Sequence, residues 1–337
     1  MHDGSEEAVA PIPSPEQTFH PFRLVYILGT GRCGSTLLDI LLGAHPDFCS
    51  TGELTQLPMI AHGAAQPCSC GADLSACEFW SQVVADVERQ FPLKELDAGR
   101  QYEYTRSLLR TAVLLGVPGS AVDRYSDRLA VLLGSISRRS GRPIVVDSSK
   151  HAGRGLILWR ARRRGMDVRF IHLVRDGRGF VWSKRRVVDG QGLGLAPRKR
   201  SVADLSTWWV ISNLLSAILF RGHPGRYLRI RYEDLVASPA ETLEKVGAFV
   251  GADLSEVIRA VREQRPVAVG HVVGGNRLRF NRALVLKPDT DWLQHLPQAD
   301  ERTFWGFAGW LARRYGYRTR AEDPTAAVER SVGSGTT

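Results

Sequence analysis

Residues 24–38 read LVYILGTGRCGSTLL, and this stretch decides the fold. Its first five residues are apolar, three glycines follow within six positions, and a second apolar run begins at Leu37. The pattern predicts a buried strand, a tight loop and the start of a helix. Such a loop can point several backbone N–H groups at one anion, with the positive end of the helix dipole behind them. The stretch therefore predicts a binding site for phosphate or a similar anion.

The loop differs at one position from the phosphate loop of nucleoside-triphosphate-binding proteins, whose pattern is G-x-x-x-x-G-K-[ST]. Gly29, Gly34 and Thr36 fit that pattern, whereas Ser35 stands where the lysine belongs. The positive charge lies inside the loop, at Arg32, whose guanidinium can bind two oxygens of a phosphate or sulfate at once. The sequence therefore favours a ligand that carries phosphate and argues against an ordinary kinase.

Residues 31–38, GRCGSTLL after a strand, resemble the 5′-phosphosulfate loop of sulfotransferases that use 3′-phosphoadenosine 5′-phosphosulfate (PAPS). The resemblance implies a three-layer, P-loop-like α/β fold, with a central, mostly parallel sheet flanked by helices and a helical insertion. It also implies PAPS as the cofactor, bound in the loop by Gly31, Arg32, Cys33, Gly34, Ser35 and Thr36.

A second motif lies at residues 168–186, where an apolar strand is followed by a turn and a helix. Arg175 precedes Ser183 by eight residues, and this spacing resembles the 3′-phosphate motif of the same enzymes. A loop arginine and a serine two turns into a helix can face one phosphate. The two motifs occur in the expected order, and this agreement is the strongest sequence support for a sulfotransferase.

Three further residues are candidates for catalysis. An Ala-His-Pro segment followed by Gly-Glu resembles tyrosylprotein sulfotransferases, the closest match in motif layout, and implies that Glu53 is the general base. The alternative is that Glu53 caps the next helix. Lys150 follows a predicted strand at its carboxyl end, where ligands bind in open α/β sheets. It resembles a catalytic lysine, and His151 is an alternative base because its ordinary pKa is near neutral.

Two later segments complete the expected cofactor site. Tyr232 follows a predicted strand, within a Tyr-Glu-Asp-Leu element that resembles the family. Residues 271–282 resemble the late cofactor loop of bacterial members, from which Arg277 is predicted to bind the cofactor. Arg279 and Arg282 are the alternatives in that loop.

Two other segments are interpreted without the resemblance. Residues 188–201 are rich in glycine and basic residues and are expected to form a mobile lid. Trp208 and Trp209 are expected to pack in the core.

The net charge of +10 is concentrated in one part of the chain. Residues 151–200 contain 14 Lys and Arg against three acidic residues. Such an excess can serve nucleic acid, an anionic membrane or an anionic small ligand, or it can be a solvated helix face. The aromatic residues are not interleaved with the basic ones as in single-strand binders, so no nucleic-acid partner is predicted.

The organisation along the chain is predicted as one domain with two tails. Residues 1–20 and 321–337 are expected to be disordered, and residues 21–320 to form the sulfotransferase domain, with its helical insertion at about 80–140. The first 21 residues lack the features of a secretory signal. The longest apolar run, at 208–220, is interrupted by polar residues, so no transmembrane segment and a cytoplasmic location are predicted.

Cys68, Cys70 and Cys77 form a dense cluster among the five cysteines. Together with His62 they could supply four zinc ligands. The alternative, which the irregular spacing favours, is a loop that packs its thiols. Similar Cys-x-Cys-Gly stretches occur in bacterial sulfotransferase-like proteins.

The predicted reaction moves the sulfuryl group of PAPS in line to a hydroxyl or amine of a small-molecule, sugar, lipid or peptide acceptor. Arg32 and Lys150 would stabilise the leaving 5′-phosphate, and Glu53 would accept the proton. No metal is required, because arginine and lysine supply the positive charge. The alternatives are a kinase that uses ATP and magnesium, with Asp147 as metal ligand, and a non-enzymatic nucleic-acid binder. The sequence does not indicate whether the protein is a monomer or an oligomer.

Overall fold

The computed structural model describes residues 21–63, 66–186, 200–281 and 283–319. Its strands are β1 (Phe22–Gly29), β2 (Phe48–Ser50), β3 (Ile144–Lys150), β4 (Met166–Val174), β5 (Tyr227–Arg231), β6 (Val267–Ala268) and β7 (Ala283–Leu284). Its 3₁₀ helices are η1 (Leu54–Gln56), η2 (Arg100–Tyr102), η3 (Thr105–Ser107), η4 (Arg162–Arg164) and η5 (Arg277–Phe280). Both predicted tails, and residues 188–199 of the predicted lid, lie outside the described residues.

The α-helices are distributed along the whole described chain. They are α1 (Ser35–Gly43), α2 (Leu57–Ala61), α3 (Glu78–Glu88), α4 (Lys94–Gly99), α5 (Leu108–Leu115), α6 (Ala121–Ser140), α7 (Ala152–Ala161), α8 (Gly177–Arg186), α9 (Val202–Phe220), α10 (Tyr232–Ala237), α11 (Pro239–Val250), α12 (Ser255–Arg262), α13 (Asp291–His295) and α14 (Gln298–Arg314).

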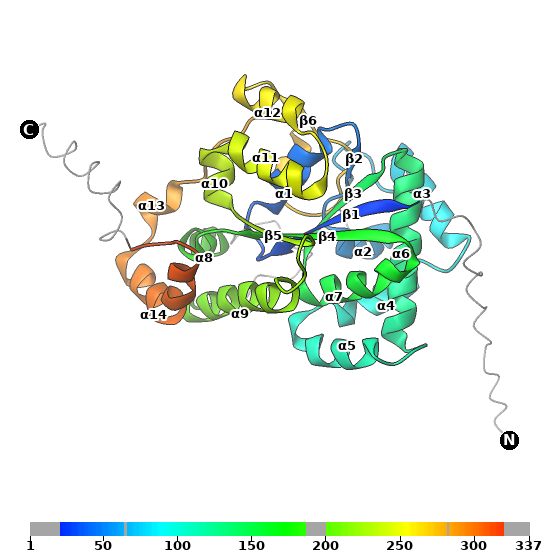
Figure 1. The fold of residues 1–337 in the computed structure, drawn as a ribbon, viewed down its shortest axis with the longest axis horizontal. Coiled ribbons are helices and arrows are strands. Elements are labelled where there is room, and N and C mark those ends of the chain that lie inside the picture. The colour runs from blue at the N-terminus through cyan, green and yellow to red at the C-terminus, as the bar shows by residue number, and fades with distance from the viewer. Residues whose placement is uncertain (1–20, 64–65, 187–199, 282, 320–337) are drawn as a thin grey trace, which may run out of the picture.

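The central sheet has the strand order β2-β3-β1-β4-β5, and all its neighbouring strands are parallel (Figure 1). The most apolar segment of the sequence, β1, lies in the middle and pairs with β3 on one side and β4 on the other. A strand covered on both faces needs apolar side chains on both, and β1 is buried along almost its whole length. The predicted α/β fold with a mostly parallel sheet is confirmed.

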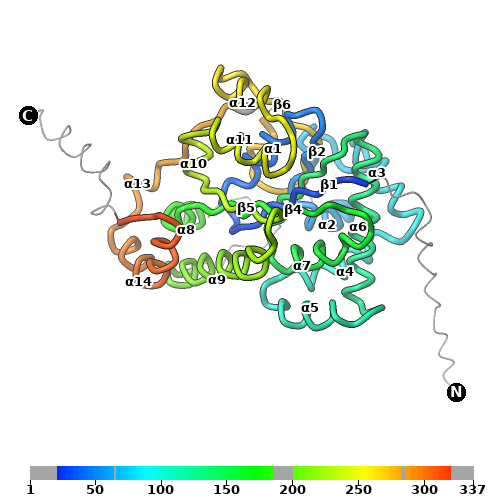
Figure 2. Tube along the Cα trace, viewed as in Figure 1, coloured from blue at the N-terminus to red at the C-terminus, as the bar shows by residue number. Residues whose placement is uncertain are grey.

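Helices cover both faces of the sheet, and alternate residues of β1 face opposite layers. Leu24, Tyr26 and Leu28 pack with helices that include α3, α4, α6 and α7. Val25 and Ile27 pack with α1, α11 and α12. Figures 1 and 2 show α10, α11 and α12 on one side of the sheet and α5, α7 and α9 on the other. The three layers are therefore helix, sheet and helix.

The helical insertion lies between β2 and β3 and contains α3, α4, α5 and α6. The longest of these helices, α6, begins at Ser120, whose side chain accepts a hydrogen bond from the Asp123 N–H, and ends at Gly141 in a left-handed conformation. These are common signals for the start and end of a helix. Contacts of α6 with α3, α4 and α7 attach the insertion to the helical layer.

Among the described residues, α9 is the only helix long and apolar enough to cross a membrane. A buried helix of a folded domain passes the same test of length and composition, and Trp209, Asn213 and Phe220 of α9 are almost fully buried. The helix packs against α14 and the sheet strands β1 and β4. Packing within the fold therefore accounts for the buried face of α9, whereas Ile211 and Ile218 are exposed.

The parallel arrangement brings five strand ends to one edge of the sheet. In the register of the sheet, Leu28 of β1 lies beside Lys150 of β3, and Gly29 lies beside Leu173 of β4. The segments that follow β1, β2, β3, β4 and β5 therefore begin side by side. Each of them carries a residue that the sequence predicts for the site.

Candidate active site

A cleft of about 860 Å³ lies at the carboxyl edge of the sheet. Most of the predicted site residues line it, namely Gly31, Arg32, Gly34, Ser35, Thr36, Glu53, Lys150, Arg175, Ser183 and Tyr232. The alternative base His151 lines it as well. The structure thus brings together residues that are up to about 200 positions apart in the sequence.

The phosphate loop runs from the end of β1 into α1. Gly34 has a φ of 95°, and a Cβ atom there would lie 2.4 Å from the ring of Tyr232, so the loop and the ring require glycine. The first intrahelical bond of α1 runs from the Leu38 N–H to the Gly34 carbonyl. The N–H groups of the preceding turn point out of the helix end, where an anion can accept their hydrogen bonds.

Two of the cleft's basic residues have strained backbones. Arg32 and Lys150 have φ angles of 67° and 75°, and Gln264 is the only other non-glycine residue with positive φ in the described chain. For a residue that has a side chain, this conformation is unfavourable in free energy, and it tends to persist at functional sites. The strain indicates that the fold holds these two side chains in place for binding or catalysis.

Lys150 and Glu53 form an ion pair inside the cleft. The Lys150 Nζ lies 2.6 Å from Oε1 of Glu53 and donates a 2.7 Å hydrogen bond to the Ser148 carbonyl. The Gln56 Nε2 donates to Glu53 Oε2 at 2.6 Å. Glu53 precedes η1 but makes no side-chain capping bond, so the capping alternative is not realised.

The ion pair determines the protonation state of Glu53. Burial by itself raises the pKa of this carboxyl, but the charge of Lys150 and the hydrogen bonds from Lys150 and Gln56 outweigh it and lower the pKa below its usual value. Glu53 is therefore ionised at neutral pH and can accept a proton. The same interactions weaken it as a base for as long as Lys150 remains paired with it.

His151 lies beside Lys150 at the start of α7. Its ring packs edge-on against Tyr104, with the ring centres 5.4 Å apart. Burial is the largest cause that lowers the pKa of His151, and Lys150 adds to it against the opposing charge of Glu103. The imidazole is therefore neutral at physiological pH, so both predicted bases are in a state that accepts protons.

Arg175 follows β4 and crosses the cleft to the phosphate loop. Its Nη1 donates to the Arg32 carbonyl at 3.1 Å, and its Nη2 lies 2.9 Å from the carboxylate of Asp289. The guanidinium stacks on the ring of Tyr232, 4.7 Å from the ring centre. Its Nε is buried and has no hydrogen-bond partner in the described chain. A buried arginine with an unused donor is an anion-binding group.

Several cleft residues were not predicted from the sequence, among them Lys184, Lys287, Asp289 and Asn276. Lys184 follows Ser183 on α8, and its Nζ lies against Gly31. Removal from water, followed by the charges of Arg32 and Lys150, lowers the pKa of Lys184. Lys287, Asp289 and Asn276 reach the cleft from the segments after β7 and before η5. The position of Lys184 next to the predicted Ser183 was one available signal, and that of Asn276 within the predicted late loop was another, whereas Lys287 and Asp289 lie in a segment without a motif.

The core packing expected for Trp208 and Trp209 holds fully for Trp209 and in part for Trp208, which packs against the same cluster. Trp209 is fully buried, as predicted, and its Nε1 donates to the Arg175 carbonyl at 3.0 Å. Trp208 is only half buried and lines the cleft. Neighbouring residues of a helix point about 100° apart, so one tryptophan packs in the core and the next faces the ligand site.

Two predicted cofactor residues do not line the cleft. Cys33 is fully buried, and its Sγ accepts a hydrogen bond from the Ser35 N–H, so it supports the loop from beneath. Arg277 starts η5 outside the cleft wall, which the late loop reaches through Gly275 and Asn276 instead. Gly275, with a positive φ, lies close to Thr36, and Leu278 and Asn281 after Arg277 line the cleft as well.

The alternative arginines of the late loop do not replace Arg277. Arg279 is buried beneath the loop, donates to the Gly275 carbonyl at 2.9 Å, and does not line the cleft. Arg282 lies outside the described residues.

Asp147 is not available as a ligand for magnesium. It is fully buried, accepts a 2.8 Å hydrogen bond from the Nε of Arg154, and does not line the cleft. The same arginine pairs with buried Glu103, to which the Tyr125 hydroxyl also donates at 2.6 Å. This network joins β3, α6 and α7 beneath the cleft. The structure therefore contradicts the role that the kinase alternative assigned to Asp147.

Acidic side chains from other elements neutralise part of the basic segment. Arg160 lies 2.7 Å from Asp123, and Arg164 lies 2.8 Å from Asp127, both on α6. Arg178 is buried between Asp176 and a glutamate of α14. Much of the local charge excess therefore holds helices together instead of forming a free basic surface.

A buried carboxyl fixes the segment that carries Glu53. Asp39 of α1 accepts hydrogen bonds from the Gly52 N–H at 2.8 Å and from the Ser148 hydroxyl at 3.2 Å. Burial raises the pKa of Asp39 to about 7. A neutral Asp39 avoids the cost of a buried charge while it links α1, the segment after β2, and β3.

Residues 167–256 match the model of the sulfotransferase family. The matched segment contains the Arg175 and Ser183 motif and Tyr232, and it agrees with the family that the sequence resemblance implied. Enzymes of this family take the sulfuryl group from PAPS, the cofactor that the sequence predicts. No curated protein sequence matches the chain.

The chain is similar to several solved sulfotransferase structures over most of its length. The sulfotransferase domain of the Synechococcus PCC 7002 olefin synthase is 20% identical, with 91% of this chain and 98% of that chain covered and a TM-score of 0.46. The corresponding domain of the curacin biosynthetic pathway is 18% identical, covers 89% and 99%, and has a TM-score of 0.47. Mouse sulfotransferase SULT7A1, complexed with PAP, is 12% identical, covers 92% and 88%, and has a TM-score of 0.46. Similarity at this level does not identify the acceptor.

Proposed function

We propose that the cleft binds PAPS with its phosphosulfate against the loop after β1 and transfers the sulfuryl group to an acceptor hydroxyl or amine beside Glu53. The observation that carries this proposal is the convergence of Arg32, Lys150 and Arg175 on one cleft that also contains the Lys150–Glu53 ion pair. The three basic side chains stabilise an anion, and the Glu53 carboxylate can remove a proton. In-line sulfuryl transfer requires both.

The 5′ end of the donor is assigned to the phosphate loop. The N–H groups in the first turn of α1 and the side chain of Arg32 would bind the 5′-phosphate and the sulfuryl group. Lys184, beside Gly31, adds a second cation. Charge that develops on the leaving phosphate is stabilised most by donors that are already in place, and the strained backbone of Arg32 fits this role.

The 3′-phosphate is assigned to Arg175 and Ser183. Both line the same cleft, and the buried Nε of Arg175 is a donor without a partner in the described chain. Asp289 pairs with the guanidinium through Nη2. A phosphate on Arg175 would compete with this carboxylate, so donor binding would release Asp289 and the segment that carries it.

Lys150 connects donor binding with proton removal. It pairs with Glu53 at 2.6 Å, and the bridging oxygen of a bound phosphosulfate would attract the same ammonium. As Lys150 turns to the leaving group, Glu53 loses its counter-charge, and its pKa rises toward the range of an effective base. His151, neutral and on the same wall, is the second candidate base.

The acceptor is a small molecule, sugar, lipid or peptide that carries a hydroxyl or an amine. Trp208 and Thr105 line the cleft and would contact it, and an aromatic wall suits an acceptor with an apolar or ring-shaped part. The motif layout around Glu53 favours phenolic hydroxyls, as in tyrosylprotein sulfotransferases. We further propose that the enzyme works in the cytoplasm without a nucleic-acid partner.

The proposal is tested by turnover. The enzyme is incubated with PAPS and a panel of acceptors that includes a tyrosine peptide, a sugar and a lipid alcohol, and release of 3′-phosphoadenosine 5′-phosphate (PAP) is measured. Acceptor-dependent release without magnesium, lost in Arg32→Ala, supports the proposal. Turnover of ATP with magnesium in the same cleft, without turnover of PAPS, would replace it with the kinase.

A further inference from the structure

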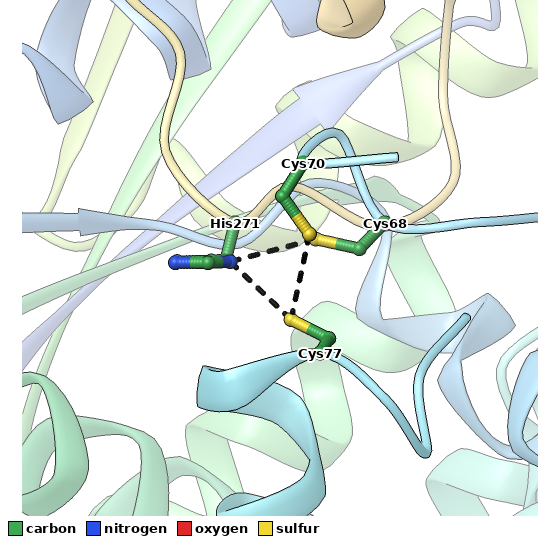
Figure 3. A group of neighbouring side chains, drawn as sticks. All are labelled: Cys68, Cys70, Cys77 and His271. Carbon is green, nitrogen blue, oxygen red and sulfur yellow. Dashed lines mark hydrogen bonds between the residues drawn. The ribbon is translucent and has the colours of Figure 1, made fainter. Parts of the chain in front are cut away.

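Three cysteines and a histidine meet outside the active-site cleft. The ligand atoms of Cys68, Cys70, Cys77 and His271 all lie within 4.8 Å of one another (Figure 3). The Sγ atoms of Cys70 and Cys77 are 3.8 Å apart. The Nδ1 of His271 lies 3.7 Å from the Sγ of Cys68 and 3.3 Å from that of Cys77.

These distances have the scale of a tetrahedral metal site. Zinc binds sulfur at about 2.3 Å and imidazole nitrogen at about 2.0–2.1 Å, so a tetrahedron around zinc has S–S edges of about 3.8 Å and S–N edges of about 3.5 Å. The three distances agree with those edges. A disulfide would need two sulfurs about 2.05 Å apart. We propose that Cys68, Cys70, Cys77 and His271 bind one structural zinc ion.

The environment of the sulfurs supports this assignment. Cys77 immediately precedes α3, and its Sγ accepts hydrogen bonds from the N–H groups of Phe79 and Trp80. The Sγ of Cys68 accepts one from the Cys70 N–H. Hydrogen bonds from neighbouring groups that hold the ligand atoms in position are typical of metal sites.

The histidine is held with Nδ1 toward the sulfurs. Its ring stacks on Phe79, with the ring centres 5.5 Å apart and the planes 23° apart. The Trp80 Nε1 donates to the His271 carbonyl at 2.9 Å. Neighbouring groups that fix a ligand's orientation are typical of metal sites. Four protein ligands leave no open position, so the ion would be structural and not catalytic.

The fourth ligand in this proposal is His271. The sequence suggested His62 for this position, and that suggestion was wrong. His62 ends α2, is exposed, and places its Nδ1 2.7 Å from the Pro58 carbonyl. His271 follows Cys77 by 194 positions. The site therefore connects two loops that are distant in sequence, which no spacing rule for a single segment can detect.

The zinc ion would hold the late loop against the active site. Two residues after His271, the Val273 N–H donates to the Thr51 carbonyl at 2.9 Å, and the Glu53 N–H donates to the Val273 carbonyl at 2.8 Å. Farther on, the Asn276 N–H donates to the Thr36 hydroxyl at 3.2 Å. The loop that the ion anchors thus contacts both the predicted base and the phosphate loop.

The first test measures metal in the full-length protein. We expect about one zinc ion per chain after purification without chelator, and none in a variant with His271→Ala. His62→Ala is the matched control, because it removes a nearby histidine outside the cluster, and it should keep the zinc. Cobalt(II) added to the metal-free protein should give the intense visible absorption of a tetrahedral site with thiolate-to-cobalt charge transfer.

A second measurement avoids variants that fail to fold. The wild-type protein is treated with a thiol-binding mercurial, and released zinc is followed with a chromogenic chelator. We expect one ion per chain, and a melting temperature that falls when a chelator removes the ion and recovers with Zn²⁺ but not with Mg²⁺. Reduced protein that takes up neither zinc nor cobalt, or a chain two mass units lighter from a disulfide, would overturn the proposal.

The metal content and the cobalt spectrum do not depend on sulfuryl transfer. We also expect the metal-free protein to lose affinity for PAP, because the anchored loop contacts the phosphate loop, and this expectation alone rests on the proposed function. A zinc site without PAP binding would therefore contradict the proposed function alone, and PAP binding in a protein that takes up no metal would contradict the zinc site alone.

Discussion

Removal of the Lys150 ammonium should change the ionisation of Glu53. In the variant Lys150→Met, the carboxylate keeps only the Gln56 hydrogen bond in a site where its side chain is 18% exposed. The Coulomb attraction at the observed 2.6 Å is about 6 kcal/mol at an effective dielectric constant of about 20. Loss of one partner of a buried pair typically costs about 3–5 kcal/mol, and the partial exposure places this pair at the lower end.

The lowered pKa of Glu53 determines in which direction stability and activity change with pH. Since Lys150 lowers the pKa of Glu53, the pair stabilises the fold above the unfolded-state pKa, and this stability is lost as pH falls through the folded-state pKa. In Lys150→Met the pKa of Glu53 rises, so the acid limb of the kcat/KM profile should move to higher pH. Turnover should also fall, because the leaving phosphate loses a cation.

The assay combines pH–rate profiles with chemical denaturation of Lys150→Met, Glu53→Gln and the double variant. The double-mutant cycle should give a coupling free energy of about 2–3 kcal/mol. Glu53→Gln should lower kcat about 10²–10⁴-fold if this residue is the base, and His151→Gln should not. A coupling energy below about 0.5 kcal/mol, together with an unmoved acid limb, would refute the ion-pair argument.

Three further substitutions test the surroundings of the site, and a fourth, Gly119→Ala, is the control for the first. Gly34→Ala should destabilise the fold by about 2–5 kcal/mol in urea and weaken PAP binding, because the Cβ would meet the Tyr232 ring 2.4 Å away at a φ of 95°. Gly119→Ala, at a φ of 70° with open space around it, should cost only about 1 kcal/mol and leave PAP binding unchanged, and equal costs would contradict the steric argument. The pKa of Asp39 is about 7 when folded against 3.8 ordinarily, so the folded state binds more protons in between and stability falls as pH rises. Between pH 4 and pH 8, the free energy of unfolding of Asp39→Asn should therefore increase relative to that of the wild type by up to about 4 kcal/mol. Parallel stability curves of the two proteins would show the raised pKa to be wrong. Arg154→Met should cost about 3–5 kcal/mol in denaturant midpoint analysis, because it leaves two buried carboxylates uncompensated, and a neutral result would contradict the buried network.

The fold and most of the cleft could be predicted because their signals are contiguous. A buried parallel strand reads as an apolar run, and the residue that matters follows directly at its carboxyl end. Arg32, Lys150, Arg175 and Tyr232 all occupy such positions, so locating the strands also located them. The eight-residue spacing from Arg175 to Ser183 likewise lies within one turn and the helix that follows it.

The remaining features depend on contacts between distant segments. Asp289 meets Arg175 across 114 positions, and no motif marks the segment that carries it. His271 joins the cysteine cluster from another loop, whereas the sequence offered His62 because it was near. Arg277 carries the expected charge but starts η5 outside the cleft wall. Side-chain direction within a loop depends on backbone turns, such as the one at Gly275, that composition does not reveal.

Binding of PAP to the folded protein tests the central claim most directly. A ligand that binds only the folded state stabilises it by about 2.7 kcal/mol at 100 times its Kd, which corresponds to a rise in Tm of about 5 °C or more. We predict this rise with PAP, a smaller one with ADP, and its loss in Arg175→Ala. A rise with ATP and magnesium, and none with PAP, would contradict the account.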